Sequence, residues 1–161
     1  MLTDGLLLSG KRIVVAEDDY LLATTVCRDL EEQGATVLGP APTPFYAMQL
    51  IGPDGRRKID AAVLDVHLHG LTVYEVAEVL QDRGVPFIFT TGFEKTFMPT
   101  RFDSIPVVQK PTGSTGIAQA LSKLLSKPQA AHSLQRLPVP PLSYEPPVVH
   151  FARALARQIV T

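Results

Sequence analysis

Side chains that can do chemistry follow four short apolar segments at widely separated positions of the chain. They are Glu17, Asp18, Asp19, Asp65, Thr91 and Lys110. Carboxylates gathered at one place resist ionisation unless a cation joins them, and Mg²⁺ prefers carboxylate and phosphate oxygens. A lysine and a hydroxyl can bind the remaining oxygens of a phosphoryl group. These residue types favour a site at which an aspartate forms an aspartyl phosphate beside a divalent cation.

The four apolar segments that precede these residues, at 12–16, 61–64, 86–89 and 105–109, are predicted to be strands of one sheet. A fifth strand is predicted at residues 36–39. Short, continuous apolar runs are typical of parallel strands that are buried on both faces. In such sheets ligands bind beyond the carboxyl ends of the strands. We therefore expect the chemically active side chains to meet at one edge of the sheet.

Helical patterns alternate with these strands. One apolar stripe ends at Gly34, another runs from Val73 to Gly84, and Thr43 with Pro44 is typical of a helix start. A last helix is expected near residues 117–125, capped by Thr112 or Ser114, whereas residues 93–104 predict a short or irregular fourth helix because Pro99 interrupts them. The alternation predicts a flavodoxin-like, doubly wound α/β fold with five parallel strands in the order 2-1-3-4-5.

The composition is that of a globular protein with ample core material. Of 161 residues, 45% are hydrophobic and 19% charged, and the net charge of −1 gives no general reason to expect nucleic acid or an acidic membrane as partner. The single cysteine, Cys27, excludes an intrachain disulfide, and its helical surroundings favour a small buried hydrophobe over a reactive thiol. No segment near residue 1 is typical of a signal peptide or membrane span, so we expect a soluble, cytoplasmic protein.

The chain divides into four predicted parts. Residues 1–9 are expected to form a loose leader and residues 10–127 the α/β domain. Residues 128–147 contain six prolines and predict a semi-rigid linker, for which a polyproline ligand is the less favoured interpretation. Residues 148–161 predict an amphipathic helix that needs a surface to pack against. This tail is too short and too rich in proline for a helix-turn-helix, so direct DNA binding is not expected.

Four motifs, taken together, resemble the receiver domain of response regulators in two-component signalling, in the CheY-like superfamily. The resemblance spans about residues 10–127. The matching segments are Val14-Val15-Ala16-Glu17-Asp18-Asp19, Leu64-Asp65-Val66, Phe89-Thr90-Thr91-Gly92 and Val108-Gln109-Lys110-Pro111. Each motif is weak alone, but their order and spacing fit the family jointly.

The resemblance implies a phosphoacceptor and a metal site. Asp65 matches the phosphoacceptor, and Asp18 matches the direct ligand of Mg²⁺, with Glu17 acting through water. The main-chain carbonyl of His67 matches the third protein ligand. The cofactor implied is therefore Mg²⁺, held by Glu17, Asp18, Asp65 and His67.

The resemblance also assigns the residues that act on the phosphoryl group. Thr91 matches the hydroxyl that moves onto it, and Lys110 matches the lysine that pairs with it. A cis peptide bond between Lys110 and Pro111 is expected in the family, and proline makes such a bond tolerable.

Three features depart from the family pattern. Val107 stands where the switch aromatic normally lies, and the compressed fourth helix remodels the usual output surface. His67 and Phe93 occupy the positions that tune dephosphorylation in the family. Bulk at these two positions predicts an acyl phosphate that is shielded from water.

The resulting hypothesis is a single-domain response regulator that catalyses only its own phosphoryl transfer and dephosphorylation. The expected phosphodonor is a sensor histidine kinase or a histidine phosphotransferase, and the expected output is contact with a downstream protein, without DNA or membrane binding. A homodimer through the C-terminal helix, or through the surface made by the last strand and its flanking helices, is a further expectation.

Several alternatives compete with this hypothesis. The acidic run at 17–19 could only start a helix, and His67 and His69 could hold zinc with Asp65, although no further ligand is evident. A receiver-like binding module that is never phosphorylated is the second function. An aspartyl-phosphate phosphatase is less favoured, because such enzymes carry an acid two residues after the nucleophile, where this chain has His67. No nucleotide-binding glycine motif follows the first strand.

Overall fold

The computed structural model describes residues 5–52, 54–92, 97–111 and 114–127, all within the compact unit Met1–Gln129. The strands are β1 (Arg12–Ala16), β2 (Thr36–Ala41), β3 (Ala61–Asp65), β4 (His67–Leu68), β5 (Leu71–Thr72), β6 (Phe87–Thr91) and β7 (Val107–Gln109). The helices are α1 (Tyr20–Glu32), α2 (Pro44–Ile51), α3 (Tyr74–Asp82), the 3₁₀ turn η1 (Thr100–Phe102) and α4 (Ser114–Ser126). The predicted linker at 128–147 and the predicted helix at 148–161 lie outside the described residues.

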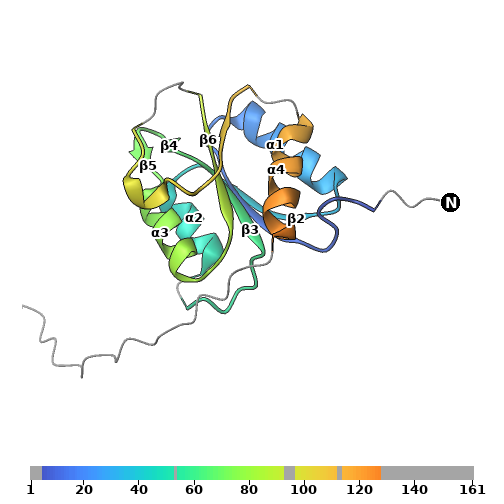
Figure 1. Cartoon of the computed structure of the whole chain (residues 1–161). Helices are drawn as coiled ribbons and strands as arrows, with labels where there is room; N and C mark the ends of the chain where they lie inside the picture. Colours follow the sequence, from blue (N-terminus) through green and yellow to red (C-terminus); the bar gives the residue numbers. More distant parts are fainter. Residues whose placement is uncertain (1–4, 53, 93–96, 112–113, 128–161) are drawn as a thin grey trace, which may run out of the picture. The chain divides into compact units, whose positions relative to one another are not determined.

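Five of the strands form one parallel sheet in the order β2-β1-β3-β6-β7. Strands β4 and β5 form a separate antiparallel hairpin. With that hairpin set aside, the order is the predicted 2-1-3-4-5, and the flavodoxin-like α/β fold is confirmed. Helices α2 and α3 cover one face of the sheet, and α1 and α4 cover the other (Figure 1).

The sheet is buried on both faces, which explains why its strands read as continuous apolar runs. In β1, Val14 and Ala16 pack with α2 and α3, whereas Ile13 and Val15 pack with α1 and α4. Because successive side chains of a strand point to opposite faces, both sets must be apolar. The sheet is therefore a rigid frame whose carboxyl-end loops can carry polar side chains.

Local sequence signals fix the starts of two helices. The Thr43 side chain accepts a hydrogen bond from the Tyr46 N–H, with Pro44 at the first helical position, as predicted. Asp19 caps α1 by accepting a hydrogen bond of 2.9 Å from the Leu22 N–H. The interpretation of the acidic run as a helix start thus holds for Asp19. Glu17 and Asp18 do not cap the helix and belong to the site described below.

The connection between β6 and β7 contains the 3₁₀ turn η1 in its described part, in line with the predicted short or irregular fourth helix. Phe102 of this turn is 1% exposed and packs against the rings of Tyr74, Phe87 and Phe89. A buried aromatic of this short turn thus covers part of the sheet. Residues 93–96, with Phe93, lie outside the described residues.

The segment expected to be a loose leader differs from that expectation at Leu8. Its side chain is completely buried in the core between the sheet, α1 and α4, and its N–H donates to the Gln33 carbonyl at 2.9 Å. The apolar run at residues 6–8 is too short to show periodicity, so sequence alone did not indicate that one member packs inward. The described part of this segment belongs to the domain.

Cys27 behaves as an inert thiol. Burial and the nearby Glu31 carboxylate raise the pKa of Cys27 to about 11, so the reactive thiolate is scarce near neutral pH. The residue is half-buried rather than fully buried. Within the described part of the chain, no helix is long and apolar enough to cross a membrane.

The burial of Leu8 predicts a large loss of stability when it is truncated. Leu8→Ala should lower the free energy of unfolding by about 2–5 kcal/mol, because it removes buried methyl groups and leaves a cavity. Urea unfolding followed by circular dichroism measures this loss. Leu7→Ala, at a position that is 46% exposed, is the matched control and should cost less than about 0.5 kcal/mol. Equal losses in both variants would show that Leu8 does not pack as described.

Candidate functional site

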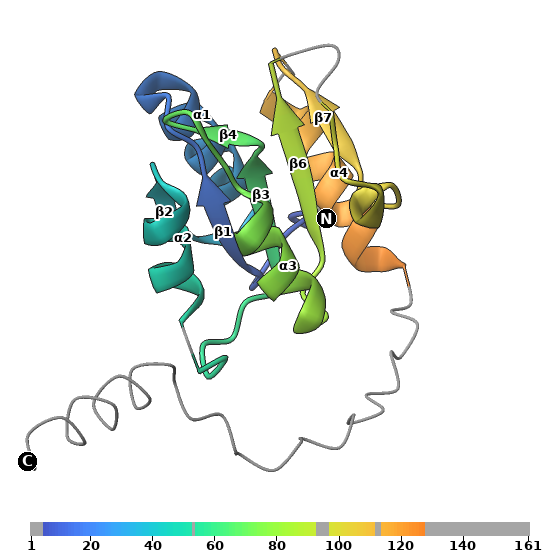
Figure 2. The same cartoon turned by 90° about the vertical axis from the view of Figure 1, so that its left-hand side faces the viewer.

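The carboxyl ends of the parallel strands bring the predicted residues to one edge of the sheet (Figure 2). Asp65 ends β3, whereas Glu17 and Asp18 directly follow β1, the neighbouring strand. Thr91 ends β6, and Lys110 directly follows β7. The Lys110 N–H donates to the Thr91 carbonyl at 2.8 Å, so the last two strands also end side by side.

The Lys110 ammonium group joins two carboxylates at this edge. Its Nζ lies 2.5 Å from Glu17 Oε2 and 2.7 Å from Asp65 Oδ2. Glu17 is 5% exposed and Asp65 is 7% exposed. Charge-assisted hydrogen bonds of this kind are the interactions that make buried carboxylates tolerable.

Three carboxylates form a group that could hold a cation. Oxygens of Glu17, Asp18 and Asp65 all lie within 4.8 Å of one another, and no other such group of His, Cys, Asp or Glu occurs in the described part of the chain. Clustered carboxylate oxygens fit a hard divalent cation, which also relieves their mutual repulsion. The alternative zinc site is not favoured, because neither His67 nor His69 belongs to a group of this kind among these residues.

Each of the three carboxylates also accepts a hydrogen bond from a main-chain N–H. The Asp19 N–H donates to Glu17 Oε1 at 3.1 Å. The His67 N–H donates to Asp65 Oδ1 at 3.3 Å, and the His69 N–H donates to Asp18 Oδ2 at 2.8 Å. The backbone therefore orients all three side chains toward the same small volume.

The electrostatics of the site follow from burial and pairing. Burial raises the pKa of Glu17, because it outweighs the hydrogen bond from Lys110 that acts in the opposite direction. Burial alone would lower the pKa of Lys110, but hydrogen bonds to Asp65 and Glu17 outweigh it and raise this pKa. Partial burial would raise the pKa of Asp18, but the hydrogen bonds from the His69 N–H and its own N–H, with the nearby positive charge of Lys110, together outweigh burial and lower this pKa. Lys110 therefore stays cationic at neutral pH, and Asp18 is anionic.

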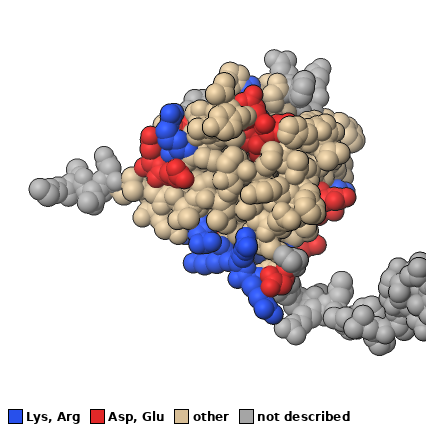
Figure 3. All heavy atoms as spheres, turned by 180° about the vertical axis from the view of Figure 1, so that it is seen from behind, with Lys and Arg blue, Asp and Glu red and all other residues tan. Residues whose placement is uncertain are grey.

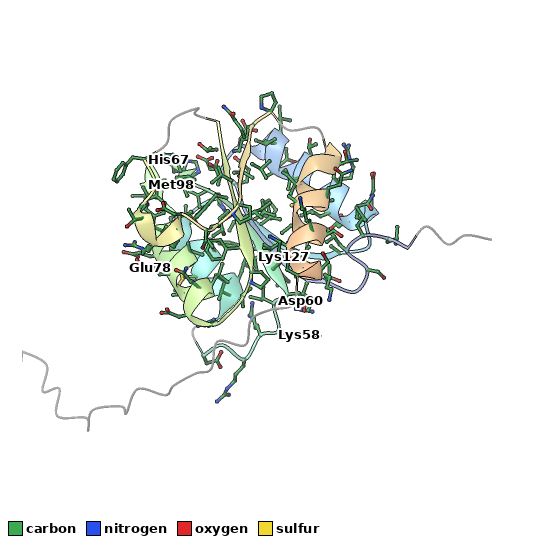
Figure 4. The ribbon with its side chains drawn as sticks, viewed as in Figure 1. Lys58, Asp60, His67, Glu78, Met98 and Lys127 are labelled. Carbon is green, nitrogen blue, oxygen red and sulfur yellow. The ribbon has the colours of Figure 1, made fainter. Side chains whose placement is uncertain are left out.

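The remaining predicted features lie around this cluster. Thr91 is buried at the end of β6, and the peptide bond between Lys110 and Pro111 is cis, as the resemblance implied. Val107, at the position of the family's switch aromatic, is 48% exposed. His67, whose carbonyl is the predicted third metal ligand, lies two residues beyond Asp65 at the start of β4 (Figure 4).

Two features of the site region went unpredicted. One is the β4–β5 hairpin, in which His69 and Gly70 have φ of +49° and +79°. A His-Gly pair between leucines is a weak hairpin signal that could have been noticed. The other is the cis peptide bond between Gly39 and Pro40 in β2.

Basic side chains gather at the opposite end of the sheet, at the lower edge of the face seen in Figure 3. Arg57, Lys58 and Arg83 line a cleft there. Guanidinium groups of the two arginines donate to carbonyls at the C-terminal end of α2, where cations favour the helix dipole. The two arginines thus bind the C-terminal end of α2, and the cleft shares no residue with the acidic site.

The fold and the site can be compared with known proteins. Neither a scan against family models nor a search of curated proteins finds a match. Among solved structures, SdrG from Sphingomonas melonis Fr1 is 39% identical, with a TM-score of 0.62, and the alignment covers 71% of this chain and 96% of that chain.

Two further structures extend the comparison. The BeF3-activated conformation of SdrG from Pseudomonas melonis Fr1 is 37% identical, with a TM-score of 0.57 and coverage of 76% of this chain and 98% of that chain. A CheY-like response regulator receiver domain protein from Methanospirillum hungatei JF-1 is 21% identical, with a TM-score of 0.62 and coverage of 71% and 93%. This last likeness concerns the fold alone.

The pairing of Lys110 predicts a pH-dependent loss of stability when its charge is removed. In Lys110→Met the buried Glu17 carboxylate loses its cationic partner, and its pKa should rise further. In the folded variant Glu17 then keeps its proton at pH values above the ordinary pKa of a glutamate, where the unfolded chain has already released it. The variant therefore loses stability as pH rises. The deficit relative to the natural sequence should be small at pH 4 and about 3 kcal/mol at pH 7 in buffer free of divalent ions.

Urea unfolding at several pH values measures this deficit. Lys123→Met, which removes the exposed lysine near the end of α4, is the control and should show no such pH dependence. A deficit for Lys110→Met that is constant between pH 4 and pH 7 would contradict the assignment.

Proposed function

Because the chain belongs to the receiver-domain family of response regulators, we propose that it accepts a phosphoryl group onto Asp65 in a Mg²⁺-dependent reaction. The observation that carries the proposal is the convergence of Glu17, Asp18 and Asp65 on one small volume, with Lys110 bonded to two of them. A nucleophile, a site for a cation and a fixed positive charge are the parts that phosphoryl transfer requires.

The proposed reaction uses few protein groups. An Asp65 oxygen attacks the phosphorus of the donor, an oxygen–phosphorus bond forms, and the bond from phosphorus to the donor's leaving group breaks. Lys110, already 2.7 Å from Asp65 Oδ2, is placed to pair with the transferred group, and the Thr91 hydroxyl is proposed to bind it as well. Mg²⁺ held by Glu17, Asp18, Asp65 and the His67 carbonyl would neutralise charge that develops on the phosphoryl oxygens.

Exposed apolar side chains beside the site support a protein as phosphodonor. Tyr20 and Leu21, in the first turn of α1, are 79% and 76% exposed, and Phe45 in the first turn of α2 is 73% exposed. Both helices begin on the carboxyl side of the sheet, where Asp65 lies. Large apolar groups in such positions are typical of protein-binding surfaces. We propose a sensor histidine kinase or a histidine phosphotransferase as donor, and protein contact as output.

A second candidate function is a receiver-like binding module that is not phosphorylated. The observation that favours it is Val107, which is 48% exposed where the family's switch aromatic would stand. Phosphorylation would then lack its usual route to the output surface. The phosphatase alternative has no such support, because the position two residues after Asp65 is His67, where such enzymes typically carry an acid.

Phosphorylation of the full chain tests the leading proposal directly. Incubation with Mg²⁺ and acetyl phosphate should add one phosphoryl group, detected by intact mass, and Asp65→Asn should abolish the addition because it removes the nucleophile. Asp103→Asn, which changes an exposed aspartate after η1, is the matched control and should be phosphorylated normally. Absence of the adduct in the natural sequence, with beryllofluoride and Mg²⁺ also causing no chemical-shift changes around Asp65, would favour the binding module.

The lifetime of the acyl phosphate should depend on the two residues that follow the site motifs. His67 and Phe93 are bulky, and we propose that they hinder attack by water on phosphorylated Asp65. A His67→Asn, Phe93→Glu double variant should therefore lose its phosphoryl group several-fold faster after the donor is removed. Intact mass followed over time measures both half-lives. An unchanged or longer half-life in the double variant would exclude this shielding.

A further inference from the structure

The β4–β5 hairpin reaches from the end of β3 to the acidic residues that follow β1. The His69 N–H at its tip donates a hydrogen bond of 2.8 Å to Asp18 Oδ2, across 51 positions of sequence. We infer that this hairpin is a positioning element for the cation site and that His69 is a positioning residue, which acts on the cation through Asp18. The inference rests on the proposed function, because it assumes that Asp18 binds a divalent cation.

The geometry of the turn makes this N–H available. Leu68 pairs with Leu71 and His67 with Thr72, so His69 and Gly70 form a two-residue turn. Both turn residues have positive φ, at +49° and +79°, as tight antiparallel hairpins require. In such a turn the hydrogen bonds between the strands join the flanking residues Leu68 and Leu71. The N–H of residue 69 can therefore donate to a partner outside the hairpin. That partner is the Asp18 carboxylate.

The base of the hairpin is fixed in the hydrophobic core. Val66, Leu68 and Val73 are each 0% exposed and belong to the core on the side of α2 and α3. The Val73 N–H donates to the Val66 carbonyl at 3.1 Å, which closes the loop from which the hairpin projects. Packing at the base of the hairpin and along β4 therefore holds the amide of residue 69 in place, although Leu71 on β5 is exposed.

The main chain, rather than the imidazole, supplies the hydrogen bond. His69 Nδ1 lies 3.9 Å from Asp18 Oδ2, which is beyond hydrogen-bond range but within the distance of an ion pair with a protonated imidazole, and the side chain is 61% exposed. Any residue that tolerates a left-handed backbone at position 69 should therefore preserve the orientation of Asp18. A residue that disturbs the turn should not. Groups that orient metal ligands in this way typically change metal affinity by about 10- to 100-fold when they are removed.

A pair of glycine substitutions tests the hairpin. Gly70→Val forces a β-branched side chain onto φ of +79°, and Gly84→Val does the same at φ of +66° at the end of α3, away from the site. An added Cβ meets nothing within 4 Å at either glycine, so the two variants carry similar backbone strain. Titration calorimetry of the full chain with MgCl₂ should show about tenfold weaker binding for Gly70→Val and unchanged binding for Gly84→Val.

A second pair of variants isolates the N–H itself. Replacing the amide N–H of residue 69 with an ester oxygen removes the donor and keeps the side chain, and should weaken Mg²⁺ binding about tenfold. His69→Gly removes the imidazole and keeps the donor, and should bind Mg²⁺ as the natural sequence does. Undiminished Mg²⁺ affinity in the ester variant would overturn the inference, even if Gly70→Val failed to fold.

The outcomes separate this inference from the proposed function. If the natural sequence binds Mg²⁺ and the ester variant binds it weakly, the positioning role holds even when acetyl phosphate leaves no adduct on Asp65. If acetyl phosphate does leave an adduct but Gly70→Val and the ester variant both keep full Mg²⁺ affinity, the phosphoacceptor role stands and the positioning role is wrong. If the natural sequence does not bind Mg²⁺, both are wrong.

Discussion

A single ammonium group between two buried carboxylates is the interaction on which the site depends. Lys110 neutralises part of the charge that Glu17 and Asp65 place inside the domain. Without a partner, such charges are too costly to bury, so the pairing is a condition for having these acids here at all. The same ammonium is available to a phosphoryl group, so a contact that stabilises the fold is also suited to the proposed reaction.

The sheet makes this contact possible because its order is not the order of the chain. Residues 17, 65 and 110 are far apart in sequence, but β1 and β3 are neighbours and β7 lies two strands beyond β3. Both faces of the sheet are covered by helices, so polar side chains gather at its ends, and the acidic residues do so at the carboxyl edge (Figure 1). Burial of the strands and exposure of their ends are thus two results of one architecture.

The region between β6 and β7 shows how this chain differs from the family pattern. Phe102 of this connection packs inward against Phe87 and Phe89, whereas Phe97 is exposed and Val107 on β7 presents a small side chain. The Tyr74 hydroxyl donates to the Phe97 carbonyl at 2.9 Å and ties the same connection to α3. Any coupling between the site and this surface must therefore use contacts other than the rotation of an aromatic at position 107.

The sequence by itself determined the strand order and the identity of the clustered residues. Apolar runs that end in Asp65 or Lys110 are local patterns, and the rules for parallel sheets then place their ends together. Only the tertiary structure decided which backbone groups orient these side chains. The hydrogen bond from His69 to Asp18 and the burial of Leu8 against α1 and α4 join segments whose local patterns do not indicate each other. Long-range packing selects such contacts, and short windows of sequence contain no signal for them.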